Sequence, residues 1–71
     1  MKTLIAQWKS KSGKWYADLY QDDYGYGYCG NNCGGSLAAK TEAEAIAEIE
    51  NRNAFGWFQP DMNKTPLKRV M

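Results

Sequence analysis

Apolar and polar residues alternate with a period of two at the start of the chain, in two runs separated by four residues. The runs are residues 3–9 and 14–20, and the separating segment is residues 10–13. Alternation places successive side chains on opposite faces of a strand, and a glycine near the end of such a loop suits a type I turn. The pattern therefore predicts an antiparallel hairpin with one apolar face. That face would hold Leu4, Ala6, Trp8, Trp15, Ala17 and Leu19.

The loop length also predicts a register for this hairpin, with Lys9 opposite Lys14. The apolar pairs that follow are Trp8 with Trp15, Ala6 with Ala17, and Leu4 with Leu19. A slip of one residue would turn both tryptophans to the polar face, so we expect the register that buries them. The polar face would carry Thr3, Ile5, Gln7, Lys9, Lys14, Tyr16, Asp18 and Tyr20.

A second period-two pattern, rich in tyrosine and glycine, follows a short polar segment. Residues 24–29 predict a strand, and residues 34–39 a returning strand after a connection of glycine and asparagine at residues 30–32. With Cys29 opposite Cys33, Tyr24, Tyr26 and Tyr28 would project from the outer face of the sheet, and Leu37 would point toward the core. The glycine density also fits a mobile loop over residues 22–35. The hairpin and the loop are both open alternatives.

The hydrophobic period changes to that of a helix after residue 40. Thr41 and Glu44 form a capping box, in which the Thr41 side chain accepts from the third helical amide and Glu44 reaches back to the Thr41 N–H group. We expect the helix to fray near residues 51–53, shortly before Gly56. The expected buried stripe is Ala45, Ile46, Ile49 and Asn53.

The C-terminal part combines aromatic residues with a segment that contains two prolines. Phe55, Trp57 and Phe58 are expected to cap the open end of the core. Residues 60–66 predict a loop, and the end of the segment 60–71 fits either an edge strand or a tail. The whole pattern predicts one α+β domain over residues 1–71: an antiparallel sheet of three to four strands with one helix packed on one face, in two layers.

Composition narrows the range of functions. Apolar residues make up 44% of the chain and charged residues 24%, as in folded globular proteins. There is no histidine, so a Ser or Cys nucleophile would lack its usual base. Two cysteines supply only half of a closed zinc site, and no phosphate-binding glycine loop precedes a helix. We expect no catalytic residues, no metal and no cofactor.

The expected location follows from the absence of a targeting pattern in this sequence. The apolar run at residues 1–6 is shorter than the core of a signal peptide, and no segment has the length and apolar character needed to cross a membrane. We therefore expect the cytoplasm, where Cys29 and Cys33 would stay reduced. Under oxidising conditions a disulfide between the two strands is the alternative.

The remaining candidate chemistry is that of binding. Tyrosine offers a large, rigid contact area with a polar tip, so the candidate partner-binding residues are Tyr16, Tyr20, Tyr24, Tyr26 and Tyr28. Lys9, Lys11 and Lys14 at the tip of the first hairpin are candidate contacts to phosphate or to an acidic partner. The net charge of +1 is too small to drive non-specific binding to nucleic acid. A protein or nucleoprotein partner is therefore favoured, with nucleic acid as the alternative. In a third interpretation, two or three tyrosines close a second small core with Phe55, Trp57 and Phe58.

The segments Gly13-Lys14-Trp15, at the start of a strand, and Lys40-Thr41-Glu42-Ala43-Glu44-Ala45, at the start of a helix, carry a family resemblance. Over roughly residues 3–53 the chain resembles the three-strand-plus-helix, AP2-like arm-binding domains of phage tyrosine recombinases. The resemblance implies that the sheet enters the DNA major groove, with contacts from Lys9, Lys11, Lys14 and Tyr16. Asp18, Asp22 and Asp23 on or beside that face depart from the family pattern. In size and character the chain is also similar to small phage inhibitors such as anti-CRISPR proteins.

Overall fold

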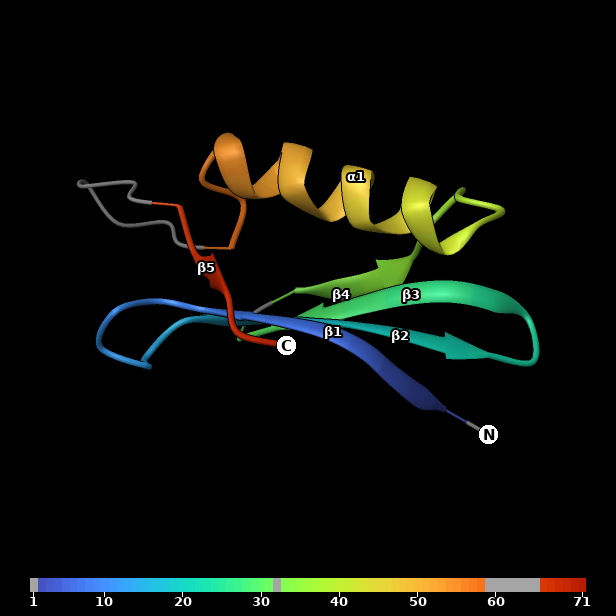
Figure 1. Ribbon diagram of the computed structural model, residues 1–71, viewed down its shortest axis with the longest axis horizontal. Helices are drawn as coiled ribbons and strands as arrows, with labels where there is room; N and C mark the ends of the chain where they lie inside the picture. The colour runs from blue at the N-terminus through green and yellow to red at the C-terminus, as the bar shows by residue number, and fades with distance from the viewer. Residues whose placement is uncertain (1, 32, 59–65) are drawn as a thin grey trace.

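The chain forms an antiparallel sheet that is covered on one face by a single helix (Figure 1). The computed structural model describes residues 2–31, 33–58 and 66–71. The strand order is β4-β3-β2-β1-β5. The predicted α+β fold in two layers is confirmed, with five strands in place of three to four. The elements are β1 (Thr3–Lys9), β2 (Tyr16–Asp22), β3 (Gly25–Gly30), β4 (Gly34–Ser36), α1 (Glu42–Ala54) and β5 (Lys68–Arg69).

The core lies between α1 and the sheet. Trp8, Leu19 and Ile49 are the largest side chains that are fully buried. Tyr28 and Phe58 meet edge to face, with their ring centroids 5.8 Å apart, a geometry that aromatic pairs favour. The other buried apolar residues are Ala6, Ala17, Leu37, Ala45 and Leu67.

The first hairpin has the predicted apolar face, but its register differs by two residues. Trp8 pairs with Ala17, not with Trp15. The loop is longer than predicted because Ser10 closes it: the Ser10 N–H donates to the Trp15 carbonyl at 2.9 Å, and the Ser10 hydroxyl accepts from the Trp15 N–H at 3.1 Å. The tight turn lies inside this loop, where Gly13 has a φ of 80°. Since two is an even number, the core face is unchanged.

A β-bulge corrects the predicted face of one residue in β1. The register shifts between Leu4 and Ala6, so that Leu4 pairs with Tyr20 and Ala6 pairs with Leu19. One extra residue in a strand moves the residues beyond it to the other face. Leu4 therefore leaves the predicted core face and is 43% exposed.

The second hairpin confirms one of the two alternatives for residues 22–35, with a register one residue away from the predicted one. Cys29 pairs with Gly34 and Tyr28 with Gly35, and the Gly30 N–H donates to the Cys33 carbonyl at 2.8 Å. A shift of one residue reverses the faces. The tyrosines of β3 therefore share the core side with Leu37, which the sequence pattern had opposed to them.

The helix begins where the capping box predicts. The Thr41 hydroxyl accepts from the Glu44 N–H at 3.2 Å, while the Glu44 carboxylate accepts from Lys40 N–H at 3.1 Å, one residue before the expected donor. The predicted stripe faces the sheet, with Ile46 partly buried and the other three residues buried. The helix continues to Ala54, beyond the predicted fraying. Phe55 is its C-cap, and Gly56 follows with a φ of 76°.

A buried asparagine ties the C-terminal segment to the helix. The Asn53 side chain donates to the Leu67 carbonyl at 2.9 Å and accepts from the Leu67 N–H at 2.8 Å. The chain then pairs with β1 through β5, which confirms the edge-strand alternative for this segment. The loop predicted over residues 60–66 lies mostly outside the described residues.

The aromatic residues after the helix divide between core and surface. Phe58 is 2% exposed, as predicted, but Phe55 and Trp57 do not cap the core and are 79% and 53% exposed. The Trp57 ring instead lies beside the Arg52 guanidinium, 5.9 Å from its centroid, with the Tyr28 ring 5.1 Å away from the same guanidinium. No helix within the described residues has the length and apolar character to span a membrane.

Candidate binding surface

The face of the sheet that points away from α1 is covered by no described element, and we call it the open face. Three rows of paired residues cross it, because directly paired residues of antiparallel strands share a face. The first row is Leu4, Tyr20, Gly27 and Ser36. The second is Gln7, Asp18, Cys29 and Gly34, and the third contains Lys68, Lys9 and Tyr16.

Two tyrosines of β2 occupy the middle of the open face. Tyr20 lies over β3: a Cβ atom on Gly27 would come within 2.9 Å of its ring. The Lys2 amine lies 4.5 Å from the centroid of the same ring. Because Gly27 has no side chain, the Tyr20 ring can lie against β3.

Tyr16 has a polar environment at the opposite end of β2. The neighbouring Cys29 thiolate, followed by loss of hydration and the Asp18 carboxylate, raises the pKa of Tyr16 above its usual value of 10.0. The Asp18 carboxylate accepts a hydrogen bond of 2.8 Å from the Gln7 side chain. The phenol of Tyr16 therefore ionises at a higher pH than an ordinary tyrosine, and the neighbouring acid already has a hydrogen-bond partner.

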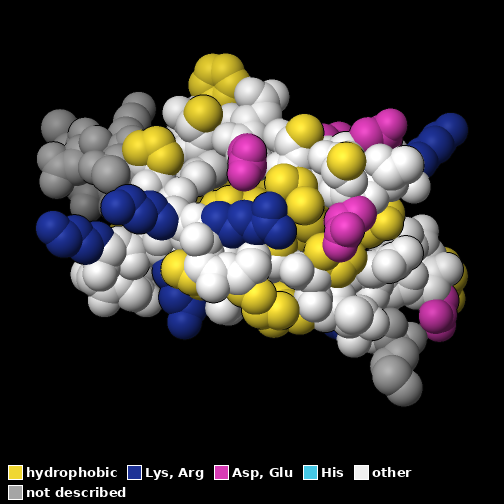
Figure 2. All heavy atoms as spheres, viewed as in Figure 1, with side chains coloured by type: hydrophobic (Ala, Val, Ile, Leu, Met, Phe, Trp, Pro, Cys, Tyr) yellow, Lys and Arg dark blue, Asp and Glu magenta, His cyan; other side chains and the backbone are white. Residues whose placement is uncertain are grey.

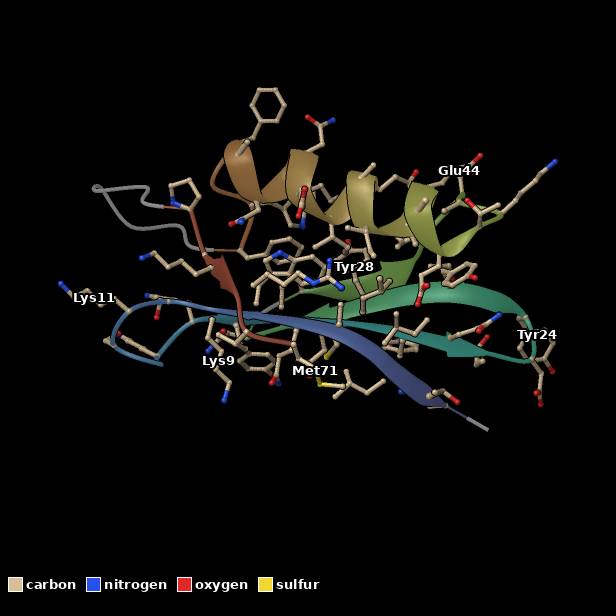
Figure 3. The ribbon with its side chains drawn as sticks, viewed as in Figure 1. Lys9, Lys11, Tyr24, Tyr28, Glu44 and Met71 are labelled. Atoms are coloured by element: carbon tan, nitrogen blue, oxygen red, sulfur yellow. The ribbon has the colours of Figure 1, made fainter. Side chains whose placement is uncertain are left out.

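Exposed aliphatic side chains flank the two tyrosines. Val70 N–H donates to the Gln7 carbonyl at 2.8 Å, so the chain continues along β1 beyond β5. Leu4, Val70 and Met71 are 43%, 57% and 52% exposed. Figure 3 shows Met71 and Lys9 on the side of the sheet away from α1. Apolar residues grouped around aromatic rings on one face are typical of an interaction surface.

The structure separates the five tyrosines that the sequence grouped on one face. Tyr28 is buried between α1 and the sheet, and Tyr26 is packed against the core. Tyr24 is 98% exposed at the turn between β2 and β3, at one end of the molecule (Figure 3). The expectation of a common outer face is therefore wrong for Tyr26 and Tyr28, because β3 pairs with β2 so that Tyr28 lies opposite the buried Leu19. Tyr24 lies outside the strands, so it belongs to neither face. Only Tyr16 and Tyr20 lie on the open face.

The predicted lysine cluster gains a member from the C-terminus. Lys9, Lys11 and Lys14 are exposed in β1 and in the first hairpin loop, and Lys68 pairs with Lys9 across the β1–β5 ladder. We call these four residues the basic end. Figure 2 shows most of the visible Lys and Arg side chains on the side of that loop. The Lys14 amine lies 5.2 Å from the Trp15 ring centroid.

The two cysteines are not joined by a disulfide. Cys29 is paired with Asp18 on the open face. The Cys33 sulfur lies close to Gly30 on the core side, because a Cβ atom added to Gly30 would be 2.9 Å from this sulfur and 3.3 Å from the Phe58 ring. The two thiols therefore lie on opposite sides of the sheet. Within the described residues, no three Cys, Asp or Glu side chains are grouped to hold a metal ion.

Sequence reasoning missed two side chains that join distant segments. Asn31 accepts from the Tyr16 N–H at 2.9 Å and donates to the Lys14 carbonyl at 2.8 Å, so it closes the first hairpin from the second. Asn53 does the same for the C-terminal segment, which brings Lys68 to the basic end. The only sequence signal for Asn53 was its polar character within the buried stripe.

Comparisons of this chain with protein-family models, with curated proteins and with solved structures found no match.

Proposed function

We propose that this protein is a non-enzymatic binding module whose open face binds a partner protein, alone or within a nucleoprotein complex. The observation that carries the proposal is the group of exposed apolar residues beside Tyr16 and Tyr20. The side chains of Leu4 and Val70 are exposed and do not pack between α1 and the sheet. In a domain of 71 residues, apolar side chains that do not stabilise the core are available for binding.

The polar groups of the open face suit a protein partner. Asp18 has a hydrogen-bond partner in Gln7, so less of its bonding capacity depends on water when the face is covered. Tyr16 and Tyr20 are both half-buried and lie against the sheet, which lowers the entropy that they lose on binding. A small cytoplasmic inhibitor, similar in character to those of phages, would act in this way.

A pull-down with matched variants tests the proposal. The double variant Leu4→Glu/Val70→Glu places two charges on the open face at positions whose exposure preserves the fold. Tyr24→Glu is the control, because Tyr24 is almost fully exposed and lies in the turn between β2 and β3, outside the three rows of the open face. We expect the wild type and the control to retain the partners that co-purify from the native cells, and the double variant to lose them. A double variant that retains them, with an unchanged circular dichroism spectrum, would contradict the proposal.

Nucleic-acid binding is a second candidate, supported by the pairing of Lys9 with Lys68. This pairing places the basic end beside Tyr16, an arrangement in which lysines contact phosphates and a ring stacks on an unpaired base. The AP2-like resemblance would use the same lysines against duplex DNA.

Titration with single- and double-stranded oligonucleotides at two salt concentrations tests this candidate. Lys9→Gln/Lys68→Gln should weaken binding and reduce its salt dependence, since each phosphate contact that is lost lowers the slope by roughly one. Lys40→Gln, at an exposed position before α1, is the control. Absence of binding by the wild type at about 50 mM salt would refute this candidate without affecting the first.

A further inference from the structure

The two edges of the sheet differ in their protection. One edge is β5, whose residues Lys68 and Arg69 are both charged. The other edge is β4, whose residues Gly34, Gly35 and Ser36 are uncharged and exposed. Charged side chains on an edge strand prevent a second strand from pairing with it. The β4 edge has no charge, no proline and almost no side chains to do so.

The hydrogen-bond pattern identifies which backbone groups of β4 point outward. The Leu37 N–H donates to the Tyr26 carbonyl, and the Gly30 N–H donates to the Cys33 carbonyl, each at 2.8 Å. These two bonds identify Tyr26–Leu37 and Gly30–Cys33 as hydrogen-bonded pairs. Each lies two positions along the ladder from the pair Tyr28–Gly35, so that pair is hydrogen-bonded as well. Bonded and non-bonded pairs alternate in an antiparallel ladder.

Gly35 therefore directs its N–H and C=O groups toward β3, whereas its two neighbours direct theirs away from the sheet. Gly34 and Ser36 thus present two donors and two acceptors at the edge. Exposure of all three residues leaves the line of approach open to a strand.

We propose that the β4 edge binds the same edge of a second copy of this chain, in antiparallel orientation about a two-fold axis at Gly35. In this arrangement Gly34 of each copy lies opposite Ser36 of the other. Both are outward-facing residues, so each pair exchanges two hydrogen bonds and all four outward groups of each strand are satisfied. The two sheets become one, with both open faces on the same side.

The chemistry of the two edges favours a dimer that pairs through β4 over a dimer that pairs through β5. Two β5 edges would bring Lys68 and Arg69 against their own symmetry mates, and like charges opposed across strands are destabilising. Two β4 edges bring together residues without charge. The absence of a side chain at Gly34 and Gly35 allows the two backbones to approach closely.

The contact is small, so the dimer is expected to be weak. A three-residue strand covers far less than the roughly 800 Å² per partner of a stable interface. Dimers should therefore form at high protein concentration and dissociate on dilution.

Sedimentation over roughly a hundredfold range of protein concentration tests the proposal, since dimer formation depends on concentration. The average mass should rise from the 8.0 kDa of one chain toward twice that value. In NMR spectra over the same range, the amide signals of Gly34 and Ser36 should shift more than that of Gly35. Ser36→Pro removes an outward donor without removing a ladder hydrogen bond, and should remain monomeric.

Ser36→Ala is the matched control, because it retains the outward N–H group and should still form dimers. Gly34→Lys is a second disruptive variant: its new Cβ atom would be no closer than 3.4 Å to any neighbour, and the two added charges would lie diagonally across the two-fold axis on the same face, where they repel each other. A wild type that stays monomeric over the whole range would overturn the proposal. A dimer that persists in both Ser36→Pro and Gly34→Lys would show that another surface is used.

Discussion

Replacement of Asn53 by alanine should destabilise the domain through the loss of its C-terminal segment. Asn53 makes two hydrogen bonds to Leu67, and both residues are buried. If the segment stays in place, the stranded N–H and C=O groups of Leu67 each cost about 1–3 kcal/mol. If it detaches, the burial of the Leu67 side chain is lost, at about 1.5–3 kcal/mol. The less costly route decides the outcome, so we expect a loss of about 1.5–3 kcal/mol.

A loss of this size is measurable in a domain of 71 residues, whose free energy of unfolding is roughly 4–10 kcal/mol. Urea unfolding followed by tryptophan fluorescence gives the difference. Asn51→Ala is the control: Asn51 is exposed on the same helix, so the same change in helix propensity applies without the loss of a contact. A difference between the two variants below about 0.5 kcal/mol would refute the assigned role of Asn53.

Three further predictions concern the cap, the glycine packing and the phenol. Thr41→Ala should lower the free energy of unfolding by about 1 kcal/mol, and Thr41→Ser should restore most of it, in the same urea assay. Gly30→Ala should cost about 1–3 kcal/mol, because its Cβ atom would come within 2.9 Å of a sulfur and 3.1 Å of a backbone carbonyl, whereas Gly34→Ala should change little. The raised pKa of Tyr16 means that its stabilising contribution is present below about pH 10 and is lost as the pH rises further. In a titration followed by tyrosinate absorbance, Cys29→Ser should lower the pKa of Tyr16 toward 10, and no change would contradict the assigned cause.

Local chemistry explains which elements could be predicted from sequence. The helix start depends on Thr41 and Glu44, which lie within one turn. The Thr41 hydroxyl makes the predicted bond with the Glu44 N–H group, and the Glu44 carboxylate accepts from Lys40 N–H, one residue before the predicted donor. The apolar alternation of the first hairpin depends only on the period of a strand. The predicted core face of this hairpin stays correct although the loop length was wrong, because a two-residue difference in register leaves each side chain on the same face.

The candidate surface was less predictable because it depends on contacts between distant segments. The connection between β3 and β4 differs from the predicted one by a single residue, and that difference moved Tyr26 and Tyr28 from the outer face to the core side. The side chain of Asn31 closes the first loop from fifteen residues away, and no local pattern indicates that contact. The alternation of apolar and polar residues likewise gives no indication of the bulge that exposes Leu4.

Site-specific photo-crosslinking tests the central claim, that the open face is the partner-binding surface, most directly. A photoreactive residue at Val70 lies on the open face, and one at Ala47 lies on the exposed side of α1. In the native cells we predict a crosslinked protein from position 70 that is absent from position 47. Crosslinking of the same protein at position 47 but not at position 70 would contradict the account.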